Sequence, residues 1–150
     1  MSTRRRSSPW PGAIAVALGL ALLAGCGGLD TIKQGERARR LSDDLRVYGK
    51  LVRWGEFSGA RAFIQVRPES EVRDPNPPGL LAAIKVTHYR LSDTVYNADL
   101  SEAAVAFELK FFHQDTRREV SGVDRQVWYW SEELSRWLLD GTLPDFSGAH

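Results

Sequence analysis

The sequence has a single cysteine, Cys26, and only three histidines among its 150 residues. One cysteine excludes an internal disulfide and any metal site built from several cysteines. The chain also lacks an HExxH pair, a GxSxG elbow, a glycine-rich phosphate loop and a dinucleotide fingerprint, so it predicts no metal and no cofactor. Neither sign of charge is in excess. The 20 basic and 19 acidic residues leave a net charge of +1, which argues against a dedicated nucleic-acid-binding protein.

Residues 1–25 have the pattern of an export signal. Three arginines, Arg4, Arg5 and Arg6, precede an apolar run of eleven residues at 13–23. A helix needs about 20 apolar residues to span a bilayer, so this run is too short to be a transmembrane anchor. A basic start followed by a short apolar stretch is typical of a secretory signal peptide.

The apolar run ends in Leu23-Ala24-Gly25-Cys26, which resembles the lipobox of bacterial lipoproteins. The resemblance implies cleavage between Gly25 and Cys26 and acylation of Cys26, so that the lipid joins the protein to a membrane. The next residue is Gly27 and not an aspartate, which by the same resemblance implies the outer membrane, facing the periplasm, rather than the inner membrane. The competing interpretation of Cys26 is a free redox or catalytic thiol.

The rest of the chain divides into three parts. Residues 26–29 are expected to form a lipid-anchored leash, 30–146 a folded domain and 147–150 a C-terminal tail. The domain is long enough to bury roughly two thirds of its unfolded surface. Four prolines between 67 and 79 predict a loop in that stretch.

Residues 30–54 predict a long helix, because apolar residues recur at helical spacing at Leu41, Leu45, Tyr48 and Val52. Gly55 is expected to end this helix, and Ser58 to cap a short second one. The other helix positions carry basic residues, which either meet anionic headgroups or form an ordinary solvated face: Arg37, Arg39, Arg40, Arg46, Lys50 and Arg53.

After Gly79 the apolar period changes towards two, which predicts strands over 81–96, 103–113, 120–130 and 136–139. The first of these is expected to be one strand or two broken near Ser92-Asp93. Along 103–113, Val105, Phe107, Leu109, Phe111 and His113 share one face, so this strand has a clear inside. Two helices followed by antiparallel strands predict an α+β domain, with the helical stripe covering the sheet.

The order of these elements resembles the nuclear transport factor 2-like, or cystatin-like, superfamily, across roughly residues 30–146. The local resemblance lies in packing and turn residues: Tyr48-x-x-Leu51-x-x-Trp54-Gly55-Glu56-Phe57-x-Gly59-Ala60, Ile84-Lys85-Val86-Thr87-x-Tyr89, Glu102-Ala103-x-Val105, Arg125-Gln126-x-Trp128, Arg136-Trp137-x-Leu139 and Leu143-Pro144-x-Phe146. It implies a cone, in which a curved antiparallel sheet holds the long helix in its concave face. Enzymes of this fold work in the open end of the cone, and the ketosteroid isomerases among them place an Asp base opposite a Tyr/Asp oxyanion hole in an apolar pocket. Those residues have no matched positions here, because Glu108 has the outward phase of its strand.

The residues expected to line such a pocket are Tyr48, Phe107, Leu109, His113 and Trp128. His113 continues the inward phase to the strand end, where it either serves the pocket mouth or is satisfied by solvent. His88 and Tyr89 are neighbours in a strand and are expected to point to opposite faces. The aromatic cluster Trp128, Tyr129, Trp130 and Trp137 is either a stacking platform or core filling.

These patterns predict a lipid-anchored envelope protein with a non-catalytic binding or accessory domain. Its expected partner is an envelope protein or a small apolar ligand. The alternatives are an enzyme that uses the cone for acid–base chemistry, and a structural subunit of an envelope complex. An enzyme requires titratable groups that converge inside an apolar pocket, whereas a docking module requires an exposed apolar patch.

Overall fold

The computed structural model describes residues 27–149. The signal peptide predicted at 1–25, its cleavage site at Gly25 and Cys26, and acylation of Cys26 lie outside the described residues. Residues Gln34–His150 form one compact unit, and the packing below is that of its described part. No helix among residues 27–149 is long and apolar enough to cross a membrane.

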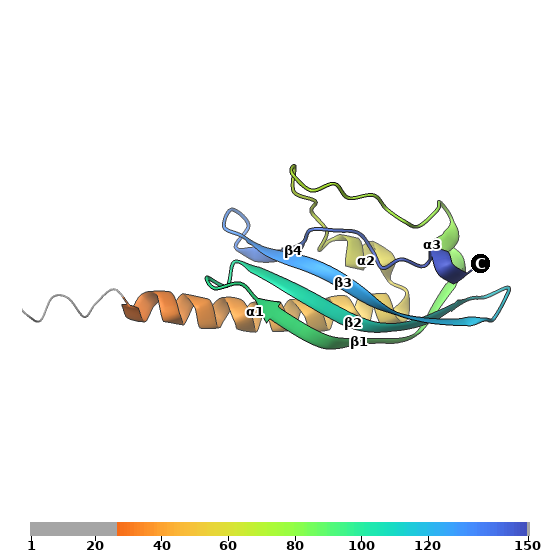
Figure 1. Ribbon diagram of the computed structural model, residues 1–150, viewed down its shortest axis with the longest axis horizontal. Helices are drawn as coiled ribbons and strands as arrows, with labels where there is room; N and C mark the ends of the chain where they lie inside the picture. Colours follow the sequence, from red (N-terminus) through yellow and green to blue (C-terminus); the bar gives the residue numbers. More distant parts are fainter. Residues whose placement is uncertain (1–26, 150) are drawn as a thin grey trace, which may run out of the picture. The chain divides into compact units, whose positions relative to one another are not determined.

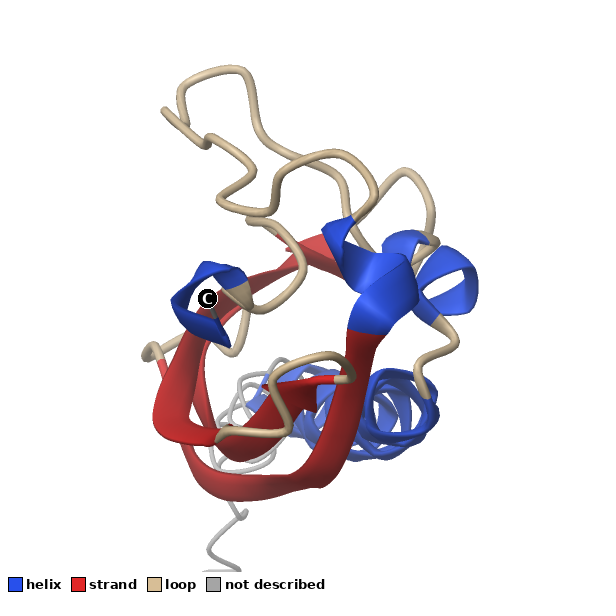
Figure 2. Ribbon diagram, turned by 90° about the vertical axis from the view of Figure 1, so that its right-hand side faces the viewer, coloured by secondary structure: helices blue, strands red, loops and turns tan. Residues whose placement is uncertain are grey.

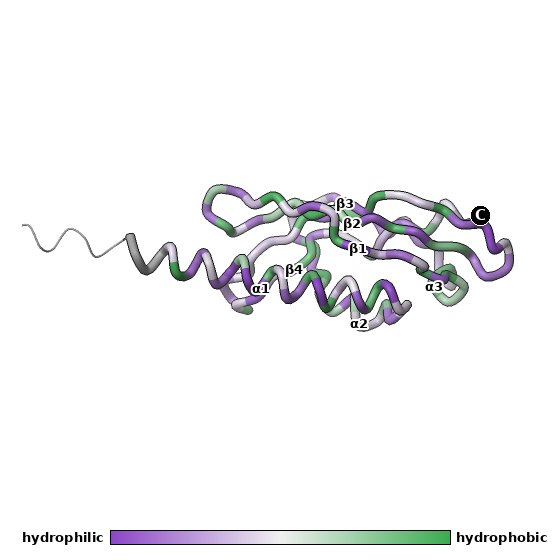
Figure 3. The backbone as a smooth tube through the Cα atoms, turned by 90° about the horizontal axis from the view of Figure 1, so that it is seen from below, coloured by the Kyte–Doolittle hydropathy of each residue, from purple (hydrophilic) through white to green (hydrophobic). Residues whose placement is uncertain are grey.

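Helix α1 spans Gly27–Trp54 and begins before Asp30, so residues 27–29, expected to be a leash, are helical. The predicted stripe of α1 is buried as expected: Leu41, Leu45, Tyr48 and Val52. Hydrophilic and hydrophobic residues alternate along the helix (Figure 3). Gly55 ends α1 as predicted, in the left-handed conformation with φ of 75°.

Helix α2 spans Phe57–Arg61, and its N-cap is Glu56, whose side chain makes no capping hydrogen bond. The prediction that Ser58 caps this helix is therefore wrong. The backbone supplies the reason: the Glu56 N–H donates to the Leu51 carbonyl at 2.8 Å. Helix α2 therefore begins at Phe57, directly after the turn at Gly55, and Ser58 lies inside the helix and not at its N-cap.

The sheet has four antiparallel strands in the order β1-β2-β3-β4. They are β1 (Ile84–Tyr96), β2 (Glu102–His113), β3 (Glu119–Ser131) and β4 (Arg136–Leu139). A short helix, α3 (Leu80–Ala83), precedes β1, which corrects the prediction that the strand begins at 81. Seen from the end, the sheet is strongly curved, and the part of α1 from Gln34 to Trp54 lies along it (Figures 1 and 2).

The curvature has a local cause in β1. Its pairing with β2 shifts register between Val86 and His88, and again between Leu91 and Asp93. Extra residues of this kind bend a strand and increase its twist. The second shift lies where the sequence suggested a break near Ser92-Asp93.

The core fills the concave side of the sheet. Val105, Phe107, Leu109 and Phe111 of β2 are all buried, which confirms the predicted inward face. The Tyr48 ring of α1 packs against Phe63, Phe107 and Trp128, with centroids 5.4 to 6.2 Å apart. The predicted α+β architecture, helices packed on a curved antiparallel sheet, is therefore confirmed.

The chain after β4 closes one end of this core. Phe146 packs between Phe57 of α2 and Phe111 of β2, at 5.4 and 5.0 Å between ring centroids. A short 3-10 helix, η1 (Ser147–Ala149), follows in the stretch expected to be a tail.

The inward phase of β2 can be tested with two neighbouring substitutions. We expect Phe107→Ala to lower the free energy of unfolding by about 3–5 kcal/mol, because it opens a cavity beneath Tyr48. Glu108→Ala, on the exposed face, should change it by less than about 0.5 kcal/mol. Chemical denaturation of both variants makes the comparison, and equal losses would contradict the strand phase.

Candidate functional site

Four polar side chains meet inside the curved sheet. The Tyr89 hydroxyl of β1 donates to Asp124 Oδ2 of β3 at 2.6 Å. The Gln126 amide nitrogen lies 2.7 Å from the same oxygen, and 3.1 and 3.2 Å from the hydroxyls of Tyr89 and Tyr48. The network thus joins α1, β1 and β3 through groups that are largely removed from water.

Strand β3 presents this network because two of its inward positions carry polar residues, next to an inward tryptophan. Asp124, Gln126 and Trp128 lie at every second position and therefore share one face. Apart from the tyrosines, Gln126 is the one buried polar or charged residue among those described, at 6% exposure. The Trp128 indole N–H donates to Gln126 Oε1 at 2.8 Å, which directs the amide N–H groups toward Asp124 and the tyrosines.

Burial controls the protonation of these groups. It raises the pKa of Asp124 above the ordinary 3.8, and outweighs the hydrogen bonds from Tyr89 and Gln126 that lower it. Burial and the nearby Asp124 charge also raise the pKa of Tyr89 and Tyr48 well above 10. Both phenols therefore stay protonated and keep their hydrogen to donate.

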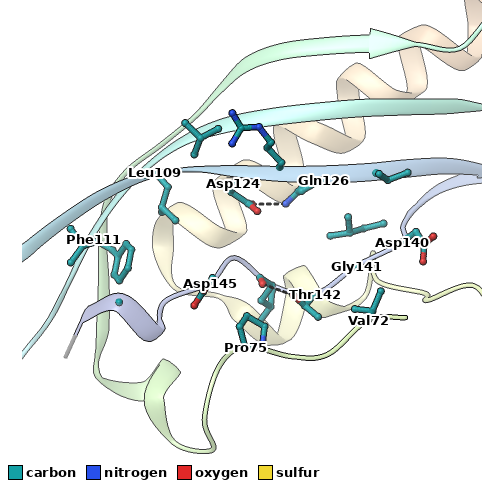
Figure 4. A pocket seen from close by; sticks show the side chains of 18 of the residues that line it. Val72, Pro75, Leu109, Phe111, Asp124, Gln126, Asp140, Gly141, Thr142 and Asp145 are labelled. Carbon is teal, nitrogen blue, oxygen red and sulfur yellow. Dashed lines mark hydrogen bonds between the residues drawn. The ribbon is translucent and has the colours of Figure 1, made fainter. Parts of the chain in front are cut away.

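A pocket of about 560 Å³ extends along the inner side of β3, beneath the segment that follows β4. Figure 4 shows Asp124 and Gln126 facing this space from β3, with Pro75 and Thr142 across from them. Apolar side chains supply much of the remaining lining: Val72, Leu109, Phe111, Val120, Leu139 and Leu143.

One oxygen of Asp124 is available to this pocket. Both hydrogen bonds of the carboxyl group end on Oδ2. The only side-chain nitrogen or oxygen atom that is both sealed from solvent and unbonded in the described part of the chain is Trp130 Nε1. Asp124 lines the pocket, and its Oδ1 makes no hydrogen bond to the described residues, so Oδ1 can accept a hydrogen bond from a molecule there.

Two polar side chains, Asn76 and Asp140, hold the far wall of the pocket in place through hydrogen bonds. Asn76 donates to the Pro144 carbonyl at 3.0 Å and accepts from the Phe146 N–H at 2.9 Å, so the proline-rich loop is tied to the C-terminal segment. Asp140 accepts hydrogen bonds from Ser70 Oγ at 2.6 Å and Arg67 Nε at 2.7 Å. Burial alone would raise the pKa of Asp140, but these hydrogen bonds outweigh it and lower the pKa.

The five residues predicted to line a pocket separate into different places. Leu109 lines the pocket beside Asp124. Tyr48 and Trp128 lie in the core behind it and connect to it through Gln126. Phe107 is also in the core, and it borders a separate groove beside α1.

The histidines lie elsewhere. His113 does not line the pocket, and its Nδ1 lies 3.6 Å from the Asp115 carboxylate in the turn after β2. His88 faces outward, with its Nε2 3.4 Å from Glu108 Oε2, while Tyr89 is buried. The expectation that His88 and Tyr89 point to opposite faces is confirmed.

Sequence reasoning missed Asp124 and Gln126. It searched for an inward acid on residues 103–113 and found none, whereas the inward acid lies on the next strand. The available signal was the phase that Asp124 and Gln126 share with Trp128. That signal was weak because Val123 and Val127 give the opposite face of β3 apolar residues too.

Comparisons with known proteins give two structural similarities. No family model matches the chain, and no curated protein matches its sequence. A structure from Streptomyces avermitilis, assigned as a dehydratase of the NTF2-like family, is 12% identical with a TM-score of 0.47, over 72% of this chain and 94% of that one. A structure from Mesorhizobium loti, assigned as a SnoaL-like polyketide cyclase, is 10% identical with a TM-score of 0.41, over 67% of this chain and 94% of that one.

The raised pKa of Asp124 makes stability depend on pH in a predictable direction. An acid whose pKa is higher in the folded state does not destabilise the fold while it is protonated. It lowers the free energy of unfolding increasingly as pH rises from 3.8 through the folded-state pKa. Asp124→Asn removes this destabilisation but keeps an acceptor for Tyr89. We expect the melting temperature of Asp124→Asn, measured by circular dichroism, to increase relative to that of the wild type as pH rises from 3 to 7. A difference that is constant over this range would contradict the raised pKa.

Proposed function

We propose that this domain binds a small, mainly apolar molecule that carries a hydrogen-bond donor, in the pocket along β3. The observation that carries the proposal is the Asp124 carboxyl group, which lines the pocket, keeps Oδ1 free of hydrogen bonds and has no cationic partner among the described residues. An uncompensated carboxylate is costly to bury, and an apolar residue would fill this position without that cost. A ligand that donates to Oδ1 accounts for its presence.

The shape and lining of the pocket support this function. Its volume of about 560 Å³ lies within the range of small-molecule sites, about 300–1,000 Å³. Such sites combine an apolar lining with a few fixed polar groups. Here Tyr89 and Gln126 fix the Asp124 carboxyl group from one side, so its free oxygen presents a defined direction to the ligand. A cone-shaped domain of the nuclear transport factor 2-like kind, as the sequence resemblance implied, fits a site in this position.

A second candidate function is acid–base catalysis on a ligand in the same pocket. The specific observation in its favour is the raised pKa of Asp124, because a carboxylate with a higher pKa is a stronger proton acceptor. In this function Asp124 removes a proton from carbon beside a carbonyl group. The hydrogen bond from Tyr89 then orients the carboxyl group for that transfer.

Ligand binding can be tested with 2-naphthol and its methyl ether, which lacks the donor. We expect the full chain to bind 2-naphthol roughly tenfold to a hundredfold more tightly than the ether at pH 8, because hydrogen bonds to charged groups contribute about 1.5–3 kcal/mol. Asp124→Asn should remove most of this preference. Asp145→Asn makes the same chemical change at the exposed edge of the pocket and should preserve it. Titration calorimetry gives both affinities.

Specific results would contradict the role of Asp124 or would show catalysis in addition to binding. Equal binding of 2-naphthol and its ether to the wild type, or equal effects of the two Asp variants, would contradict the proposed role of Asp124. Deuterium incorporation beside the carbonyl of 2-tetralone, present with wild type and lost in Asp124→Asn, would establish the catalytic function instead of binding alone.

We also propose that the chain is a lipoprotein of the cell envelope, anchored through Cys26. The lipobox-like ending Leu23-Ala24-Gly25-Cys26 supports this, together with an apolar run too short to span a bilayer. Two or three acyl chains give stable anchoring, whereas one chain binds only marginally. The ligand of the pocket would then be met in the envelope.

Anchoring predicts a clear effect of Cys26→Ser. This variant should lose incorporation of radioactive palmitate and accumulate as an uncleaved precursor that is longer than the mature wild-type protein. Palmitate labelling in a bacterial host, followed by gel electrophoresis, measures both effects. Labelling that persists in Cys26→Ser would contradict the proposed anchor.

A further inference from the structure

A second groove, of about 360 Å³, lies between the C-terminal half of α1 and strands β1 and β2. We propose that it binds one anionic amphiphile, a medium-chain carboxylate, with the apolar chain on its aromatic floor and the carboxylate at its basic rim. The groove borders different residues from the Asp124 pocket, except that the Tyr89 side chain contributes to both sites. The proposal goes beyond the ligand proposed for that pocket.

The floor of the groove is aromatic. The rings of Tyr89 and Phe107 stack in parallel, with centroids 4.5 Å apart and planes 8° apart. Leu45 of α1 completes the apolar surface beside them. Both rings border the groove but are nearly buried, so an acyl chain in the groove would lie against the edge of this stack.

Gly49 keeps this floor open. It lies in the middle of α1, where glycine costs about 1 kcal/mol relative to alanine. A Cβ atom at this position would lie 3.5 Å from Phe107 Cε1 and 4.0 Å from Tyr89 Cδ1, at ordinary contact distances. Alanine would therefore fit and would favour the helix, but its methyl group would cover part of the two rings. Helix stability gives no reason for a glycine at position 49. We attribute it to the space that the missing side chain leaves in the groove.

The rim of the groove is basic. Arg46, Lys50 and Arg53 lie on one face of α1, and Arg90 approaches from β1. None of the described residues that line the groove is acidic. This arrangement attracts an anion and repels a cation.

The nearby acidic residues compensate only part of this charge. Arg46 pairs with Asp43 at 2.7 Å, and Arg90 lies 3.4 Å from Glu108. Lys50 has no ion pair among the described residues. Its three donors can therefore meet a carboxylate without first breaking a salt bridge.

An exposed aromatic residue extends the apolar surface past the rim. Trp54 at the end of α1 is 72% exposed, and the Arg53 guanidinium lies 5.3 Å from its ring. Leu91, across the groove on β1, is also exposed. These two side chains lie at the groove and gain cover only when an apolar molecule occupies it.

Decanoate is the probe that tests this site, with decanol as the neutral comparison. The full chain carrying Cys26→Ser is used, so that no acyl group of its own competes. We expect saturable binding of decanoate, seen as shifts of the Leu45 and Leu91 amide signals in nuclear magnetic resonance, and clearly weaker binding of decanol. Lys50→Glu should weaken decanoate binding by roughly fivefold or more, and Arg39→Glu, the same kind of charge change on an exposed position of α1, should leave it within about twofold.

Gly49→Ala separates a ligand site from a structural role of the glycine. We expect it to raise the melting temperature and to weaken decanoate binding beyond about twofold, because the added methyl group occupies the floor. The proposal is overturned if decanoate does not bind saturably, if decanol binds as tightly, if Lys50→Glu and Arg39→Glu have equal effects, or if Gly49→Ala leaves binding unchanged. Binding to phosphatidylglycerol vesicles without binding of free decanoate would also overturn it, in favour of a membrane-facing surface. Each of these results is independent of 2-naphthol binding near Asp124.

Discussion

The hydrogen bond from the Tyr89 hydroxyl to Asp124 Oδ2 sets the main constraint on this domain. The two residues lie on β1 and β3, which are separated by β2, so their hydrogen bond crosses β2 on the concave side of the sheet. The two register shifts of β1 lie on either side of Tyr89 and bend that strand. The Tyr89 ring also stacks on Phe107 of β2. Tyr89 therefore makes an apolar contact with β2 and a polar contact with Asp124 of the adjacent strand β3.

Placing the polar side chains of Asp124 and Gln126 in the interior lowers stability, and the fold could form with apolar residues there. The inward positions of β2 are apolar and complete the core with Tyr48, whereas β3 places a carboxyl group and an amide in the same interior. Tyr89, Gln126 and Trp128 satisfy these groups with hydrogen bonds, yet burial still raises the pKa of Asp124. Destabilising polar groups of this kind are typical of sites that bind or react with a ligand.

The sequence predicted the features that depend on local pattern. The stripe on α1, the end of that helix at Gly55 and the alternation along β2 follow from side-chain periodicity and from glycine, and the structure confirms them. The network around Asp124 depends on which residues of β1 and β3 meet across β2, and register between distant strands is not contained in the pattern of either strand. The short helix α3 was missed because four residues are too few to show a helical period, although Leu-Leu-Ala-Ala has high helix propensity.

We infer that a carboxyl group inside the curved sheet is held ready to bind a ligand, and a measurement of the pKa of Asp124 is the sharpest check of this inference. Carbon-detected nuclear magnetic resonance of the side-chain carboxyl groups, followed through an acid titration, measures this pKa. The account predicts that Asp124 titrates above 3.8, while Asp140, held by Ser70 and Arg67, titrates below that value in the same sample. A pKa of Asp124 at or below 3.8 would show that its hydrogen bonds outweigh burial, and would contradict the proposed site.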